Sequence, residues 1–96
     1  MKTYIITYHL KNTWENYSEF YEAIKESYPE FQHFQEEAWL VKTDDTAKEI
    51  IAKIKPFLKR GDTIFVVEIT DNYEGFIAKS VWKWLKLENG YNKEKI

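Results

Sequence analysis

The sequence predicts an α+β sandwich in which two helices cover one face of a four-stranded antiparallel sheet. Four segments rich in β-branched and aromatic residues are typical of strands, and two others repeat apolar residues at helical steps of three and four. Their order is strand, helix, strand, strand, helix, strand, which right-handed crossovers fold into the ferredoxin-like βαββαβ arrangement. A short C-terminal helix and a polar tail follow. We therefore expect a single domain over residues 1–88 and a flexible tail over 89–96.

The first strand is predicted over residues 3–10, where both faces are apolar or aromatic, as expected of a central strand. Asn12 or Thr13 can cap the helix that follows, and Pro29 ends it. The apolar face of this helix consists of Trp14, Tyr17, Tyr21, Ile24 and Tyr28. Two extended segments, 31–35 and 38–43, then form a hairpin.

The second helix can be capped by Asp44 or Asp45, and Gly61 is placed to terminate it. Its apolar stripe consists of Ala47, Ile50, Ile51, Ile54 and Leu58. Pro56 falls inside this pattern. Because proline in a helix interior costs about 3 kcal/mol or more, we expect a kink or an early final turn there.

The last strand is predicted over residues 64–70, and a third helix over 76–85. In that helix Trp82 and Trp84 point about 200° apart, so both cannot enter one core. Trp84 continues the apolar stripe, which leaves Trp82 exposed or in an interface. Dimer packing and base stacking are its two alternative uses.

Helices cover only one face of the predicted sheet, and Ile5, Ile64 and Val66 are expected to point to the other face. An apolar sheet face needs a cover, and a second copy of the chain is the simplest candidate. The residues expected in this dimer interface are Ile5, Thr7, His9, Val66, Glu68 and Trp82.

Composition limits the classes of function. The chain has 96 residues, 44% of them hydrophobic and 31% charged, as in a compact globular protein rather than a disordered one. The absence of cysteine suits a reducing compartment, so a cytoplasmic location is expected. The first apolar stretch is short and lacks a small-residue cleavage site, which argues against a signal peptide or a membrane span. A net charge of −2 argues against a strongly electrostatic nucleic-acid binder.

Charge is nevertheless unevenly distributed. Residues 15–37 hold seven acids and one lysine, whereas residues 42–60 hold six bases and three acids. The candidate nucleic-acid-binding residues are Lys48, Lys55, Lys59 and Arg60. The alternative is a solvated helix face without a partner. His33 is expected to be a half-exposed histidine on an edge strand, and Glu68 to pair with a lysine across the sheet or the dimer interface.

Four short segments carry a resemblance to a known family: TYHL at 7–10, Tyr17, WLVKTD at 39–44 and FVVEIT at 65–70. They are similar to the small SinR-like proteins, relatives of the second core CRISPR adaptation protein and, more distantly, of virulence-associated protein D. The resemblance covers about residues 3–86. It implies a homodimeric ferredoxin-like protein in a superfamily of metal-dependent nucleases, toxin ribonucleases and a non-catalytic DNA-bridging subunit.

In that family the first strand usually ends in a tyrosine followed by an aspartate, which lies near the dimer axis and binds a divalent metal in the active members. Tyr8 matches the tyrosine, whereas His9 replaces the aspartate. Magnesium prefers oxygen ligands, and imidazole suits zinc, copper, nickel or iron. The replacement therefore argues against a magnesium nuclease.

Two interpretations of His9 remain. It is either a polar residue at a strand end that contacts a dimer partner, or a catalytic residue beside Tyr8. In the second case, Glu37 and Asp62 could help it hold a divalent metal, because the fold brings their strand ends near His9. We expect no cofactor in the first case, which we prefer because no ligand-spaced partner is visible.

Two classes of function follow. The preferred one is a non-catalytic homodimeric module with RNA or DNA as a candidate partner. The alternative is a metal-dependent endoribonuclease or toxin. The sequence has no serine-histidine-acid arrangement, glycine-rich phosphate loop or zinc-ligand spacing.

Overall fold

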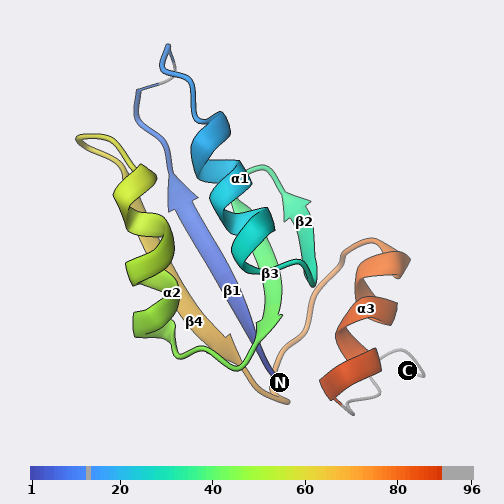
Figure 1. The fold of residues 1–96 in the computed structure, drawn as a ribbon. Coiled ribbons are helices and arrows are strands. Elements are labelled where there is room, and N and C mark those ends of the chain that lie inside the picture. Colours follow the sequence, from blue (N-terminus) through green and yellow to red (C-terminus); the bar gives the residue numbers. More distant parts are fainter. Residues whose placement is uncertain (13, 90–96) are drawn as a thin grey trace.

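The fold is a four-stranded antiparallel sheet with two helices on one face, in the strand order β2-β3-β1-β4 (Figure 1). The computed structural model describes residues 1–12 and 14–89, with side chains as far as residue 86. The elements are β1 (Lys2–His9), α1 (Ser18–Ser27), β2 (Phe31–Gln35), β3 (Ala38–Thr43), α2 (Ala47–Ile54), the 3-10 helix η1 (Lys55–Phe57), β4 (Thr63–Ile69) and α3 (Lys79–Asn89). The predicted ferredoxin-like class and the central positions of β1 and β3 are confirmed. Residues 90–96 of the predicted tail lie outside the described residues.

The main core lies between the sheet and helices α1 and α2. Alternate residues of β1 supply Tyr4, Ile6 and Tyr8, as the two-residue period of a strand requires. The other buried members of this cluster are Tyr17, Phe20, Ile24, Tyr28, Trp39, Val41, Ile50 and Ile54. Burying each large apolar side chain contributes about 1.5–3 kcal/mol.

Helix α1 begins later than the sequence predicts. Asn12 does not cap it, because the N-cap position is Tyr17, five residues further on; the Asn12 side chain instead donates to the carbonyl oxygen of Arg60, 2.8 Å away. Trp14 therefore lies in the loop before the helix and is exposed. The first helical residue is Ser18, whose backbone amide donates to the side chain of Asn16.

Helix α2 has a complete capping box at its start. The side chain of Thr46 accepts from the amide of Glu49, and the Glu49 side chain accepts from the amide of Thr46, at 3.2 and 2.8 Å. The early final turn predicted at Pro56 is confirmed. The α-helix ends at Ile54 and continues as η1, where the proline needs no helical amide bond.

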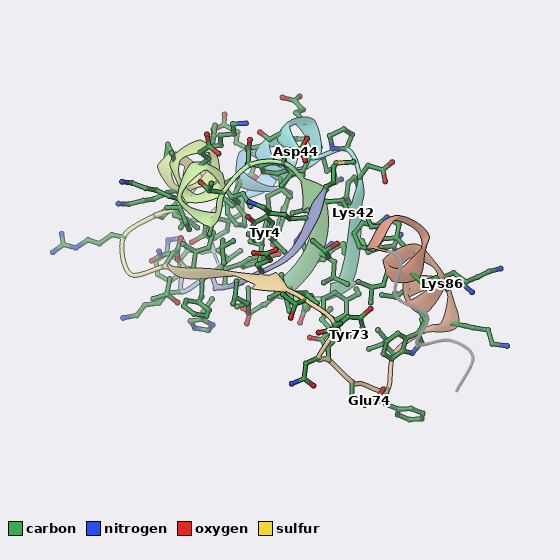
Figure 2. All side chains as sticks on the ribbon, turned by 90° about the horizontal axis from the view of Figure 1, so that it is seen from below. Tyr4, Lys42, Asp44, Tyr73, Glu74 and Lys86 are labelled. Atoms are coloured by element: carbon green, nitrogen blue, oxygen red, sulfur yellow. The ribbon has the colours of Figure 1, made fainter. Side chains whose placement is uncertain are left out.

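The opposite face of the sheet is covered in part by the same chain. A second apolar cluster is centred on Leu40, Val81 and Leu85, and Ile5 packs against it. The segment that links β4 to α3, on which Tyr73 and Glu74 lie, runs along the side of the sheet away from α1 and α2 (Figure 2). A second copy is therefore not needed to cover Ile5, contrary to the expectation from the sequence.

Lys42 connects β3 to α3. Its side chain is almost fully buried, its Nζ donates to the backbone carbonyl of Trp84, and the same atom lies 4.2 Å from the centroid of the Trp84 ring. A cation over an indole face is attracted by the ring quadrupole. This contact, together with the second cluster, holds α3 against the sheet.

The predicted orientation of β4 was wrong. Ile64 and Val66 pair with Tyr8 and Ile6 across the ladder and pack against the main core, on the helix-covered face. The reason is the register, because directly opposed residues in antiparallel strands share a face. The β4 residues on the other face are Thr63, Phe65, Val67 and Ile69.

Helix α3 also differs from the prediction, since it begins at Lys79 rather than at Phe76. Phe76 precedes it and is fully exposed. Trp82 is half-buried, not exposed, because its ring stacks on Tyr73 at a centroid distance of 6.0 Å. Both tryptophans thus contact the second cluster from different sides of the helix.

Candidate functional site at the end of β1

His9 is the last residue of β1, and its ring lies beside a single carboxylate. The distance from His9 Nδ1 to Glu37 Oε2 is 3.4 Å, and both side chains are about half exposed or more. Glu37 lies in the β2–β3 turn, and its backbone carbonyl accepts from the amide of Tyr8, 3.1 Å away. This backbone bond positions the turn next to the end of β1. The resulting pair is open to solvent.

A shallow depression of about 230 Å³ adjoins His9. It lies between the ends of β1 and β4, and its lining residues are Thr7, Tyr8, His9, Thr63, Ile64 and Phe65. Its lining is mostly apolar, and His9 contributes an imidazole ring. The depression could receive a small group that contacts the ring.

The side chain of Tyr8 points away from the ring of His9, although both residues line this depression. Adjacent residues of a strand point to opposite faces, and Tyr8 is 4% exposed in the main core. Its hydroxyl accepts from Trp39 Nε1 at 2.7 Å and donates to the carbonyl oxygen of Glu36 at 3.2 Å. Burial raises the pKa of Tyr8 far above its ordinary value. The geometry therefore assigns Tyr8 a packing role in the core.

Asp62 is also engaged away from His9. Its carboxylate accepts from the backbone amides of Lys11 and Lys59 and from the hydroxyl of Tyr17, at 2.7 to 2.9 Å. Partial burial opposes its ionisation, but these hydrogen bonds outweigh it and lower the pKa of Asp62 below the ordinary value. Asp62 thus ties the end of β1, the start of α1 and the turn before β4 together.

The metal site considered from the sequence is therefore not assembled. Of its three members, the structure brings His9 and Glu37 together and directs Asp62 to other partners. Over residues 1–12 and 14–89, no three histidine, cysteine or acidic side chains are grouped so that they could hold a metal ion.

The predicted basic residues lie on α2, η1 and the turn that follows. Lys48, Lys55 and Arg60 are exposed, whereas Lys59 is half-buried with its Nζ 5.6 Å from the centroid of the Tyr17 ring. Lys53, between them, is neutralised by Asp45 at 2.7 Å. Three of the four predicted basic residues are therefore exposed.

The sequence analysis missed a pair of apolar side chains on β4 that the structure leaves exposed. Phe65 is 65% exposed and Val67 is 43% exposed, and both lie on β4 beside Thr7 and Ile5 of β1. Glu68, named from the sequence as an interface residue, pairs with Tyr4 and so belongs to the opposite face. The register between β1 and β4 was the signal needed to find Phe65 and Val67.

His33 lies on the edge strand β2, as predicted. Its ring stacks on Trp39, with centroids 4.1 Å apart and planes 13° apart, and its Nε2 is 3.1 Å from the carbonyl oxygen of Glu36. These contacts give the His33 ring a structural role, because it covers the indole of Trp39.

Comparison with known proteins gives no match: no family model, no curated protein and no solved structure matches the chain. No helix among the residues that the structure describes is long and apolar enough to span a membrane.

Proposed function

We propose that the protein is a non-catalytic homodimeric module of the SinR-like kind. The observation that supports it is the uncovered part of the sheet, where Phe65 and Val67 are exposed next to each other. Two large apolar side chains on one strand favour burial in an interface, because water contact with apolar surface is unfavourable. A second copy of the chain is the partner proposed for this surface.

The state of the candidate site supports a non-catalytic role. The His9–Glu37 pair is exposed, Tyr8 is held in the core and Asp62 is held by three donors. General acid–base catalysis requires groups that converge on one reacting position. In this proposal His9 and Glu37 form a polar rim next to the apolar surface.

RNA or DNA is the proposed partner of the dimer. Lys48, Lys55 and Arg60 offer exposed charge, and a dimer presents two such sets. Binding through phosphate contacts releases counterions, so affinity falls steeply with salt. The cysteine-free composition fits a cytoplasmic location for such a protein.

Sedimentation velocity tests the dimer. The wild type should sediment as a dimer, and Phe65→Lys should shift it toward the monomer because the substitution places a charge in the interface. The matched control is Phe76→Lys, which changes an exposed phenylalanine outside β4 and should leave the dimer intact. A wild-type monomer at all accessible concentrations contradicts the proposal.

Nucleic-acid binding is measured with short single-stranded RNA and duplex DNA at two salt concentrations. A Lys48→Gln/Lys55→Gln variant should weaken binding and reduce its salt dependence. Binding that does not respond to salt would remove the nucleic-acid part of the proposal.

The alternative function is a metal-dependent endoribonuclease. The observation that favours it is the 3.4 Å distance between His9 Nδ1 and Glu37 Oε2, two groups that can act as metal ligands. Incubation of labelled RNA with zinc, manganese or magnesium decides between the two. Cleavage that is lost in His9→Ala and in Glu37→Gln would support the nuclease. Intact RNA with the wild type leaves the non-catalytic proposal standing.

A further inference from the structure

Strand β4 is an edge strand with the features of a pairing surface. It contributes seven residues, TIFVVEI, with apolar side chains on both faces. Its ladder with β1 runs over seven consecutive pairs without a register shift, so the strand is regular. Charged side chains, proline and bulges are the usual devices that prevent an edge from pairing with another chain; β4 has no proline and no bulge, and Glu68 is its one charged residue.

The other edge of the sheet is protected. Strand β2 has five residues, three of which are polar, and its register with β3 shifts between Gln32 and Gln35. Helix α3 lies next to β2, at this edge of the sheet, as Figure 1 shows. The β2 edge is therefore protected against pairing with a further strand, whereas the β4 edge is open to it.

A second β4 fits this edge when the two strands run antiparallel about a two-fold axis. An axis perpendicular to the sheet keeps each face on its own side, so two copies of the same residue must lie directly opposite each other, with the axis midway between them. With the two copies of Val66 opposed at the axis, Phe65 of one copy lies directly opposite Val67 of the other. The two exposed apolar side chains of the strand then cover each other in both halves of the dimer.

Charge at the two ends of β4 favours the same antiparallel pairing. The exposed Arg60 precedes the strand, and the exposed Asp71 follows it. With Val66 on the axis, Arg60 of one copy lies close to Asp71 of the other, at both ends of the interface. Asp62 is closer to Arg60 in the sequence, but its carboxylate already accepts hydrogen bonds from three groups of its own chain, so Asp71 is the acid that Arg60 of the other copy can meet.

We propose that β4 pairs antiparallel with β4 of a second copy, with Val66 on the two-fold axis, to form one continuous eight-stranded sheet. This inference rests on the dimer of the proposed function and specifies how it is built. The helices α1 and α2 of both copies then lie on one side of the long sheet, which places both exposed basic sets on that side.

The absence of native cysteine allows a direct test. Phe65→Cys and Val67→Cys each place a thiol at an exposed position, so both variants are expected to fold. Directly opposed residues have Cα atoms about 4.5–5.5 Å apart, which a disulfide can bridge. Identical residues in this register are diagonal neighbours about 7–8 Å apart or more, which is too far.

The two single variants are mixed, allowed to exchange subunits and oxidised, and the products are separated by intact mass. The mixed disulfide, which joins a Phe65→Cys chain to a Val67→Cys chain, should exceed either homodimeric disulfide several-fold. Thr7→Cys, on β1, reports packing of one sheet face on another, and it should crosslink poorly.

The outcomes separate the two proposals. A dimer by sedimentation in which the mixed disulfide predominates supports the paired edges. A dimer in which Thr7→Cys or Phe65→Cys alone crosslinks best overturns the edge pairing and leaves the dimer. A monomer by sedimentation overturns both.

Discussion

Replacing Tyr8 with phenylalanine tests the assignment of this residue to the core. The substitution keeps the ring, which packs edge-on against Phe20 at a centroid distance of 4.9 Å, and removes only the hydroxyl. The buried indole N–H of Trp39 then loses its acceptor at 2.7 Å. A buried donor left without a partner costs about 1–3 kcal/mol.

Urea unfolding followed by tryptophan fluorescence measures this loss. For a domain of this size, about 2 kcal/mol corresponds to a fall in melting temperature of roughly 8–16 °C. The dependence on urea should be unchanged, because the surface exposed on unfolding is the same. Tyr17→Phe is the matched control, and it should cost less because Asp62 keeps two backbone donors.

The result that would refute this reasoning is a Tyr8→Phe variant within about 0.5 kcal/mol of the wild type. The hydroxyl would then not be the acceptor that Trp39 requires. Phosphodiester cleavage that depends on this hydroxyl would likewise contradict the packing role.

Three further predictions concern stability. Hydrogen bonds, for Asp45 chiefly the one from Lys53, lower the pKa of Asp45 and of Asp62. The stability that the two ionised carboxylates contribute is therefore complete above their ordinary pKa of 3.8 and is lost as the pH falls below it. Urea midpoints measured across that pH range should show the loss. Thr46→Ala removes half of the capping box and should cost about 0.5–2 kcal/mol in the same assay, whereas an unchanged midpoint would mean that the cap is unimportant. Gly61→Ala should cost about 1–2 kcal/mol, because Gly61 has φ of 91° and a Cβ would lie 3.0 Å from the Lys11 side chain; a gain in thermal stability would contradict this.

The sequence predicted the fold because periodicity carries most of the information needed. The apolar stripe predicted for α2 survives in the structure, where Ile50 and Ile54 are buried. The start of α1 could not be predicted, because the helix begins after Tyr17, whose side chain makes no capping hydrogen bond, so no capping residue marks this position. The place of α3 likewise depends on Lys42, a charged residue that composition alone assigns to the surface.

The candidate site was less predictable, for a geometric reason. Tyr8 and His9 are neighbours in sequence, yet strand alternation sends their side chains to opposite faces. Strand β4 is apolar on both faces, so its pattern alone could not show that Phe65 and Val67 are the exposed pair. Only the pairing of β4 with β1 fixes that choice.

The central position of β1 has a consequence for how the chain folds during synthesis. Of the four strands in the described residues, β1 is synthesised first, but one of its two neighbours, β4, is synthesised last. Until β4 is synthesised, one edge of the apolar strand β1 has no neighbouring strand, so a chaperone or a strand of another chain can bind to it. Pairing of β1 with β4, which are far apart in the sequence, raises the contact order, so we expect refolding in milliseconds to seconds rather than microseconds.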